Sequence, residues 1–496
     1  MNWKLIWKSF ADRDMQKRIF AVLALVFVYR VMAHIPIPLG DPATLRQVLD
    51  SLYTSTNTSQ FLSFVNVLTG GALANFSIML VGLGPYINAS IIMQLLTKAL
   101  PKLEELNKEG EFGRKKINQY TRMLTLPLAI VQSIGTIYLV RQQAASVAGL
   151  GDITANASLS QWILMVAALT GGSMIMMWLG ELITEQNIGN GISLLITVSI
   201  ISSLPQATAS LISSVFSSNE TTTLLGMNLP LSRQALITST IVVVSILIVL
   251  VLVVKLNEAR RNLTISYAKR VKGSREYGGV TTVLPIKLIT AGVVPIIFAV
   301  AFLSLPTFVG QILSSSKSQN LQELGANLVQ IFQTPNAQTF QAGDITSYIY
   351  PVAYFLLVFL FTFFYTSIAF NAKEIAENLQ KQGGFISGVR SGPKTEKYLS
   401  SVVMRLTLFG AIAIGLLAVV PIFGEIFLGN NLAVSGTSIL IFVAVSLETL
   451  RHIESRALMI TYDQYDGTDY FQEAEIQKSR LAKVKSLASK VKRPKG

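Results

Sequence analysis

Residues 61–96 read FLSFVNVLTGGALANFSIMLVGLGPYINASIIMQLL, a stretch that is apolar enough to enter a bilayer but is built in two pieces. A short piece, residues 61–68, ends at Thr69-Gly70-Gly71. A longer piece, residues 76–96, is long enough to cross about 30 Å of hydrocarbon. This longer piece nevertheless contains residues that interrupt a helix or carry a polar side chain: Gly82, Gly84, Pro85, Asn88 and Gln94.

Such a sequence is unsuited to a simple lipid-facing anchor. Proline removes a backbone hydrogen-bond donor, and glycine loosens a helix. Backbone groups freed in this way are tolerated at membrane depth only where protein or a water-filled cavity satisfies them. We therefore interpret residues 61–96 as the wall and stopper of a water-containing passage.

The composition is typical of a membrane protein with several spans. Hydrophobic residues make up 51% of the chain and charged residues only 14%. The absence of cysteine excludes disulfides and thiolate metal sites, and with only two histidines no metal or other cofactor is expected. The N-terminus has a basic front and an apolar run, as a signal peptide has, but lacks a convincing cleavage site, so a retained first span is expected.

Ten apolar runs predict an all-α polytopic membrane protein with ten transmembrane helices. The runs are residues 19–35, 76–96, 123–140, 162–179, 191–213, 235–254, 284–305, 349–370, 402–422 and 437–450.

The net charge of +14 comes from basic residues that gather in alternate connections. Lys and Arg are concentrated before the first span, after the second, sixth and eighth spans, and in the tail from Arg451. The intervening loops contain only Arg46, Arg141, Arg233 and Lys317. The positive-inside rule therefore predicts cytoplasmic termini, and the charge needs no nucleic-acid partner. The exception is the loop at residues 180–190, which has Glu181 and Glu185 and no basic residue.

Ten spans divide into two sets of five, and a set of five starts and ends on opposite sides of the membrane. The second set is therefore expected to run inverted relative to the first. The second span of each set is interrupted, by Gly82-Leu83-Gly84-Pro85 and by Gly292-Val293-Val294-Pro295. Paired interruptions indicate a functional site at the interface of inverted repeats, although two ordinary kinks remain the alternative. We expect a cytoplasmic N-terminal segment (residues 1–18), a first five-helix half (19–213), an external connection (214–234), a second five-helix half (235–455) and a basic cytoplasmic tail (456–496).

Several short motifs resemble the SecY family, whose members form the central channel of the bacterial protein-translocation machinery. The motifs are IPIP (35–38), GGAL (70–73), PYINASIIMQLL (85–96), NIGNGIS (187–193), YAKR (267–270), LPIK (284–287), AGVVPIIF (291–298), KQGGF (381–385) and GTS (436–438). Any one of them alone is weak, but they cover nearly the whole chain in one order. The resemblance implies a central pore through which unfolded secretory proteins cross the membrane and from which signal sequences and membrane anchors exit into lipid.

The resemblance further implies an apolar ring that closes this pore. Its residues would be Leu83, Ile87, Ile192, Ile196, Ile297 and Ile441. The first two pairs are four residues apart, so the members of each pair share a helix face. A narrow apolar ring resists wetting and blocks ions while yielding to a passing chain. For any single one of these residues, ordinary packing or lipid contact is the alternative.

A plug and a lateral gate are implied in the same way. The plug would be residues 61–73, which close the pore from outside, with a re-entrant structural helix as the alternative; its named residues are Phe61, Phe64, Val67, Leu68, Gly70 and Gly71. The gate would lie between the second and seventh spans at Asn88, Ile91, Ile289 and Thr290. Ile289 departs from the family pattern, which often has Asn there, so Asn88 would supply the polar group of the gate.

Two loops are expected to be cytoplasmic docking surfaces. In the loop at residues 255–283, residues 258–283 alternate as a β-hairpin does, with a turn at Lys272-Gly273-Ser274. The loop at residues 372–401 includes the glycine-rich sequence GGFISGVR (383–390). The implied docking residues are Arg260, Arg261, Lys269, Arg270, Arg275 and Arg390. Proline usually follows the last arginine in the family, whereas this chain has Ser391-Gly392-Pro393.

The family uses these loops to engage the motor ATPase SecA or a translating ribosome, whose RNA is a polyanion that attracts basic side chains. For any single lysine, membrane topology alone is a sufficient explanation. The resemblance also implies that the small membrane subunits SecE and SecG bind around the helical core.

Two other functions share some of these sequence features. An ion-coupled secondary transporter of a small solute would share inverted repeats and broken helices, but it usually needs intramembrane carboxylates or histidines. The central parts of spans two to nine contain no Asp, Glu or His. An intramembrane aspartyl protease is suggested by GLGD (149–152) and Tyr462-Asp463, but both lie in connecting segments and in reversed order.

No P-loop, HExxH or GxSxG motif is present, so an enzyme is not expected. We therefore predict a passive, gated conduit for unfolded polypeptide in the bacterial cytoplasmic membrane, with the driving force supplied by a partner.

Overall fold

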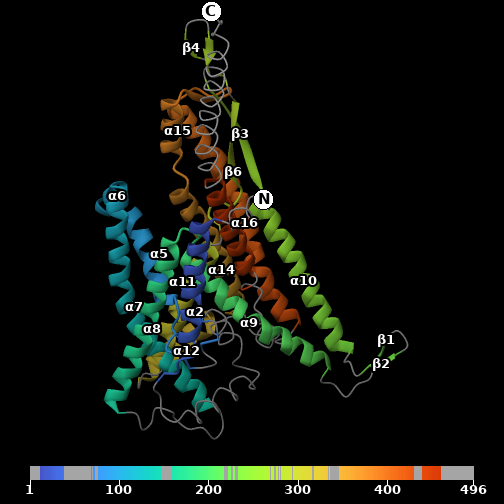
Figure 1. Cartoon of the computed structure of the whole chain (residues 1–496). Coiled ribbons are helices and arrows are strands. Elements are labelled where there is room, and N and C mark those ends of the chain that lie inside the picture. Colours follow the sequence, from blue (N-terminus) through green and yellow to red (C-terminus); the bar gives the residue numbers. More distant parts are fainter. Residues whose placement is uncertain are drawn as a thin grey trace, which may run out of the picture.

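The structure is a computed structural model, and helices make up most of it (Figure 1). It describes residues 12–37, 69, 71–72, 76–146, 158–216, 222–224, 227–229, 233–267, 270–272, 275–277, 279, 281–292, 294–314, 318–332, 335, 346–428, 438 and 440–459. The helices are α2 (Arg13–Met32), α5 (Gly84–Ala99), α6 (Pro101–Lys108), α7 (Glu111–Ser146), α8 (Leu159–Glu185), α9 (Gly191–Phe216), α10 (Arg233–Glu258), α11 (Val294–Ser314), α12 (Gln319–Phe332), α14 (Thr346–Ala369), α15 (Ala372–Lys381) and α16 (Pro393–Leu428), followed by helical residues 440–459.

Each predicted apolar run contains a helix, so the helical fold class is confirmed. Among the described residues, 5 helical segments are both long and apolar enough to cross a membrane. They are Leu159–Glu185, Leu236–Glu258, Val294–Ser314, Thr346–Lys381 and Pro393–Gly424. Two helices continue well beyond the predicted apolar run, because α7 and α16 each have 36 residues.

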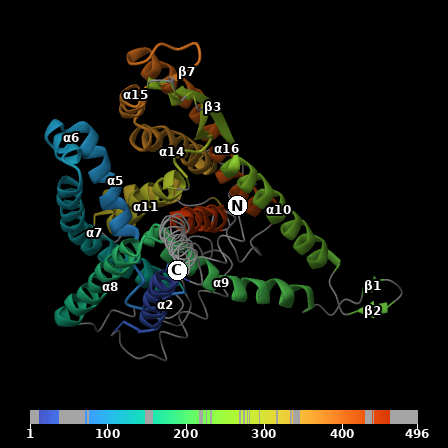
Figure 2. The same cartoon turned by 45° about the horizontal axis from the view of Figure 1, so that its top comes forward.

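The helices form two groups that correspond to the two halves of the chain. In Figure 2, α2, α5, α7, α8 and α9 lie on one side and α10, α14 and α16 on the other, with α11 next to α5. Contacts between the groups include those of α11 with α5 and α7, and those of α10 with α9. The connection from α9 to α10 includes the paired strands β1 (Thr222–Leu224) and β2 (Met227–Leu229).

The two halves repeat the same local geometry where their second helix begins. Gly82 and Gly292 both have φ of +63°, a backbone conformation that favours glycine, and in each case a proline follows three residues later near the start of α5 or α11. Seven residues before that proline, the backbone N–H of Ile78 donates to Ile35 O at 3.1 Å, and that of Leu288 donates to Ala259 O at 2.8 Å. Each half therefore hydrogen-bonds the entry of its second helix to the segment that follows its first.

The predicted beginnings of the second and seventh spans are corrected by the structure. The second helix begins at Gly84 rather than residue 76, and the seventh begins at Val294 rather than residue 284. The apolar residues of Thr281–Lys287 belong instead to a strand, β6, which pairs with β3 (Arg260–Tyr267). A short apolar strand directly before an apolar helix gives one continuous hydrophobic run, which conceals the boundary.

A small sheet lies at the end of the bundle where α11 begins (Figure 1). Its strand order is β6-β3-β7, and β7 is Gly384–Ile386. The antiparallel pairing of β3 with β6 confirms the predicted hairpin, which β4 (Arg270–Lys272) and β5 (Arg275–Tyr277) extend. The sheet has a core of its own with α15 and α16, formed by Leu263, Ile265, Ile286, Leu379, Ile386, Leu399, Val402 and Val403.

An ion pair accounts for the acidic loop that departs from the charge pattern. Arg122 Nε of α7 donates to Glu181 Oε1 of α8 at 2.9 Å, and Arg122 Nη2 lies 2.7 Å from Glu181 Oε2. The Glu181 side chain is only 16% exposed, whereas that of Arg122 is 48% exposed. The basic partner of this loop is therefore on the neighbouring helix.

Replacing Arg122 with Gln is expected to destabilise the protein more than replacing Glu181 with Gln. The first change leaves a largely buried carboxylate without its cation, at a cost of about 1–3 kcal/mol, while the second leaves an arginine that water still solvates. Unfolding midpoints of the two single variants and the double variant, measured on the purified protein in detergent, test this order. The double variant is the control and should recover part of the Arg122→Gln loss. Equal losses in the two single variants would contradict the burial argument.

Candidate functional site

One large apolar cluster occupies the space between the two groups of helices and contains all the predicted ring residues. Its members come from α2, α5, α8, α9, α10, α11, α14, α16 and residues 440–459, and from the segment before α5. Leu83, Ile87, Ile196, Ile297 and Ile441 are buried in it, and Ile192 is half-buried against it. We call this cluster the apolar seam. It brings the six side chains into one continuous hydrophobic contact surface between the halves.

The interrupted segment at residues 76–83 is satisfied by neighbouring protein. Ser173 Oγ of α8 donates to Gly82 O at 2.9 Å, and Ser77 Oγ donates to Met32 O at 2.9 Å. Gly172 of α8 lies so close to this segment that a Cβ there would collide with the Ile78 carbonyl oxygen. Of the two ways to accommodate freed backbone groups, the structure thus uses protein contacts here.

Most of the predicted plug lies outside the described residues, namely Phe61, Phe64, Val67, Leu68 and Gly70. Gly71 is described and has φ of +86°, which suits glycine at the end of that segment.

The hydroxyl of Tyr29, on α2, is hydrogen-bonded to the chain two residues before Gly71. Tyr29 is fully buried, and its Oη donates to Thr69 O at 3.1 Å and lies 2.6 Å from Ser199 Oγ of α9. The Tyr29 hydroxyl thereby joins α2 both to α9 and to Thr69, which lies within the C-terminal part of the predicted plug. Sequence reasoning missed Tyr29 and Ser199; the available signal was a polar side chain within each of two strongly apolar runs.

The predicted gate residues Asn88 and Ile91 are both buried on α5, which contacts α11. Neither Oδ1 nor Nδ2 of Asn88 has a hydrogen-bond partner among the described residues. An unsatisfied buried polar atom costs about 1–3 kcal/mol, so this amide favours any arrangement that gives it water or another polar partner.

The other two gate residues lie in the turn before α11. Thr290 is half-buried and its hydroxyl donates to Lys287 O at 3.3 Å. Ile289 is buried, lies beside Gly410 of α16 and lines an apolar cavity of about 30 Å³ with residues of α10, α11, α16 and residues 440–459. The contacts described for Ile289 are therefore within the second half of the chain.

The two predicted docking loops meet in one sheet, because β3 pairs with β7 through Ile265 and Ile386. Arg260 and Arg261 are exposed at the start of β3, and Arg390 is exposed after β7. Arg270 and Arg275 belong to β4 and β5, and Lys269 lies outside the described residues.

The turn after Arg390 contains Gly392, and Ser391 stands where family members usually have proline. Gly392 has φ of +94°, and its carbonyl accepts from the Thr395 N–H at 2.9 Å as α16 begins at Pro393. The hydroxyl of Thr395 donates to Arg390 O at 3.0 Å, which fixes the backbone that carries the arginine.

Charged side chains gather between the sheet and the start of α11. Partial burial lowers the pKa of Lys287, repulsion by Arg451 lowers it further, and Glu448 acts in the opposite direction. Glu448 Oε2 would lie 3.6 Å from a Cβ at Gly292, and Arg451 Nη2 donates to Asn257 O at 2.9 Å. The end of the apolar seam nearest the sheet is therefore lined by charge.

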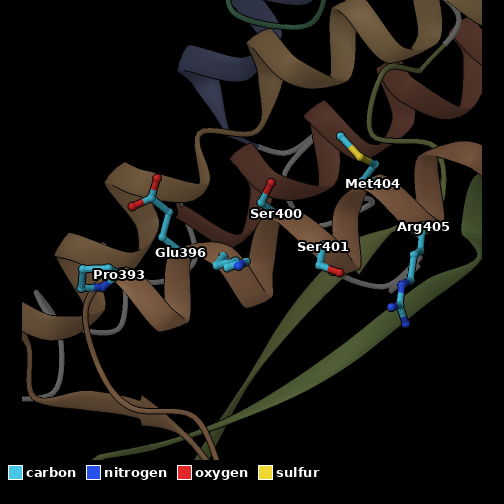
Figure 3. A pocket seen from close by; sticks show the side chains of 7 residues that line it. Pro393, Glu396, Ser400, Ser401, Met404 and Arg405 are labelled. Carbon is cyan, nitrogen blue, oxygen red and sulfur yellow. The ribbon is translucent and has the colours of Figure 1, made fainter.

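A groove of about 600 Å³ runs along α16 and contains none of the predicted site residues (Figure 3). Its lining includes Glu396, Lys397, Ser400 and Arg405, which follow one stripe of the helix. The opposite stripe packs on the sheet through Leu399 and Val403.

Two inverted helical groups that meet at an apolar seam, with a charged end and a basic sheet beside it, define a multi-pass membrane protein of the channel type. Residues 77–450 match the family model described as SecY. The chain belongs to the SecY family and is a subunit of a protein-conducting channel, a class that is not enzymatic.

Curated relatives agree over almost the full length. The chain is 39% identical to the protein translocase subunit SecY of Streptomyces galbus over 464 residues, which are 92% of this chain and 98% of the relative. It is 38% identical to that of Corynebacterium glutamicum over 466 residues, again 92% and 98%.

Solved structures share the fold at low sequence identity. A solved SecY structure from work on its plug domain superposes with a TM-score of 0.57 at 17% identity, covering 88% of this chain and 91% of the other. An idle yeast Ssh1 complex bound to the yeast 80S ribosome gives 0.58 at 17% identity, covering 88% of both chains.

Proposed function

We propose that this chain passes unfolded polypeptides across the cytoplasmic membrane of a bacterium and releases hydrophobic segments sideways into lipid, with both of its termini on the cytoplasmic side. The observation that carries this proposal is the apolar seam between two inverted halves. Moving a hydrated ion into an apolar seam without charged side chains is energetically costly. The two halves can, however, separate around a polypeptide whose own side chains contact the seam.

In this proposal, Leu83, Ile87, Ile192, Ile196, Ile297 and Ile441 form the closing ring within the seam. Five of them are buried in the seam and Ile192 is half-buried against it, which supports this assignment. Residues 61–73 would close the pore from the side opposite the sheet. The hydrogen bond from Tyr29, whose hydroxyl also contacts Ser199, to the carbonyl of Thr69 would fix the base of that plug. Asn88, Ile91, Ile289 and Thr290 would form the gate, which the contact of α5 with α11 supports.

The sheet would be the docking surface for the partner that drives transport, either the motor ATPase SecA or a ribosome. The union of the two loops by β3 and β7 supports a single surface, with exposed Arg260, Arg261 and Arg390. The small subunits SecE and SecG would bind the outside of the bundle, and the polar groove on α16 offers a surface for one of them.

Replacing Arg390 with Ala is expected to reduce translocation strongly without opening the closed channel. Arg390 is exposed at the proposed docking surface and does not belong to the apolar seam, so its loss should weaken partner binding and leave the seal intact. The measurement is protection of an exported precursor from protease in vesicles that contain the purified complex and SecA. Ion conductance of the same vesicles is measured in parallel.

The matched control replaces Lys102 of α6 with Ala, since it is also an exposed basic residue but belongs to the other half of the chain. This variant should translocate normally. Normal translocation by Arg390→Ala would remove the docking assignment, and uptake of a small solute without any motor would favour the transporter instead.

A further inference from the structure

The start of α9, which carries the ring residues Ile192 and Ile196, is attached to the bundle differently from the starts of α5 and α11. Each of those two helices is tied near its start by a backbone hydrogen bond to the segment after the preceding helix. In α9 the first N–H, that of Gly191, donates to the hydroxyl of Thr184 on α8 at 2.9 Å. A side chain therefore makes the attachment that the backbone makes in the other two helices.

The Thr184 hydroxyl uses both of its hydrogen-bonding roles at this corner. It donates to Gly180 O, one turn earlier on α8, at 2.8 Å while it accepts from Gly191. The two helices are in backbone contact here, because a Cβ at Gly191 would collide with Gly180 O. Thr184 itself is exposed, whereas Gly191 is buried. Loss of the hydroxyl would therefore leave a buried N–H without its partner.

The ring residue Ile192 lies directly on this corner. A Cβ at Gly180 would be 3.2 Å from Ile192 Cγ1, so the isoleucine side chain rests on the backbone of α8 and packs against the apolar seam from there. Ile196 follows one turn later on the same face of α9 and is buried in the seam. The positions of both ring side chains thus depend on how closely α9 begins against α8.

Two neighbouring polar contacts stabilise α9 without joining it to α8. Asn190 Oδ1 caps the helix by accepting from the N–H groups of Ile192 at 3.1 Å and Ser193 at 3.4 Å. The hydroxyl of Thr197 donates to Ser193 O at 2.9 Å, also within α9. Of these three polar contacts, only the one made by Thr184 sets the distance between the two helices.

We propose that Thr184 is a positioning residue of the closing ring, whose hydroxyl holds the first turn of α9 against α8 and so keeps Ile192 and Ile196 in the seam. This inference rests on the ring assignment in the proposed function. Thr184 is not a member of the apolar seam, so it acts through the two isoleucines. Without its hydroxyl, the Gly191 N–H gains a new partner when the start of α9 moves away from α8 and admits water. The equilibrium should then shift from the closed toward the open channel by roughly 2- to 10-fold.

Thr184→Val tests the proposal, since valine has nearly the shape of threonine but no hydroxyl. Thr184→Ser restores the hydroxyl and is the conservative rescue. Thr197→Val is the matched control, because it removes from α9 a hydroxyl whose described hydrogen bond lies within α9 itself. The purified complex of each variant is reconstituted into planar bilayers without substrate, and the open probability is measured from single-channel recordings. The unfolding midpoint of each variant is measured in parallel.

Double variants distinguish an action through α9 from a general loosening of the bundle. Thr184→Val is combined with Ile192→Asn, which alters the ring on α9, and with Ile297→Asn, which alters it on α11. Two changes that act through the same residue are not additive, whereas independent changes are. The effect of Thr184→Val should therefore largely disappear in the Ile192→Asn background and persist in the Ile297→Asn background.

The expected result is an open probability roughly 2- to 10-fold higher for Thr184→Val, with Thr184→Ser and Thr197→Val near the unchanged channel. Equal open probabilities of Thr184→Val and Thr197→Val would overturn the inference while leaving the ring in place. An equal effect of Thr184→Val in both asparagine backgrounds would overturn it too, since the residue would then act on the fold as a whole. If neither asparagine variant conducts more than the unchanged channel, the ring assignment itself is wrong, and this inference falls with it.

Discussion

Alanine at Gly172 is expected to destabilise the protein and to reduce its translocation activity severely. The added Cβ would collide with the carbonyl oxygen of Ile78, a backbone atom in the interrupted segment before α5. Backbone cannot move aside as a flexible side chain can, so α8 and the segment must separate. Overpacking of this kind costs about 1–3 kcal/mol or more. The same displacement would break the hydrogen bond from Ser173 to Gly82, which lies directly at the start of α5.

The measurements are the unfolding midpoint of the purified complex and protease protection of an exported precursor. Gly171 provides a matched control on the adjacent position of the same helix, because a Cβ there meets nothing within 4 Å among the described residues. Gly171→Ala should behave as the unchanged protein does, and it should gain a little helix propensity. Equal behaviour of the two variants would show that α8 does not brace the interrupted segment.

Asparagine at Ile87, Ile192 or Ile297 is expected to open the resting channel to ions and to admit weak signal sequences. In the closed seam the new amide would lack partners, whereas in an open, hydrated seam it would bind water. An unpaired buried polar group costs about 1–3 kcal/mol, which corresponds to a shift of roughly 5- to 150-fold in the equilibrium between closed and open states. The shift should be smaller at Ile192, which is half-buried, than at Ile87 and Ile297, which are 9% exposed.

Single-channel conductance in planar bilayers and export of a precursor with a weakened signal sequence measure this shift. Valine at the same three positions is the control, since it remains apolar and removes only one methylene group. It should leave conductance near that of the unchanged channel. Unaltered conductance and signal selectivity in all three asparagine variants would show that the ring lies elsewhere in the seam.

Sequence patterns alone predict the position and order of the long helices and the hairpin of the first predicted docking loop. These features have strong local signals: long apolar runs, alternating charge in the loops, and alternation along residues 260–267. The grouping of the six ring residues could be expected as well, but only through the resemblance to a family, since isoleucine in an apolar run carries no sign of its surroundings.

The remaining features depend on contacts between distant segments. β7 has only 3 residues, too few for a periodic pattern, and its pairing joins Ile386 to Ile265 across the whole of α11 and α14. The contact of Tyr29 with Ser199 joins two helices of opposite ends of the first half, and neither residue type marks it. The start of α11 was misplaced because a strand and a helix share one apolar run.

The matching backbone hydrogen bonds at Ile78 and Leu288 have a mechanical consequence. One links the start of α5 to the segment after α2, and the other links the start of α11 to the segment after α10. Sideways movement of α5 or α11 should therefore be coupled to movement of its own half. The two halves should therefore separate as rigid bodies, without bending of single helices. The natural pivot is the edge where α9 and α10 converge near β1 and β2 (Figure 2).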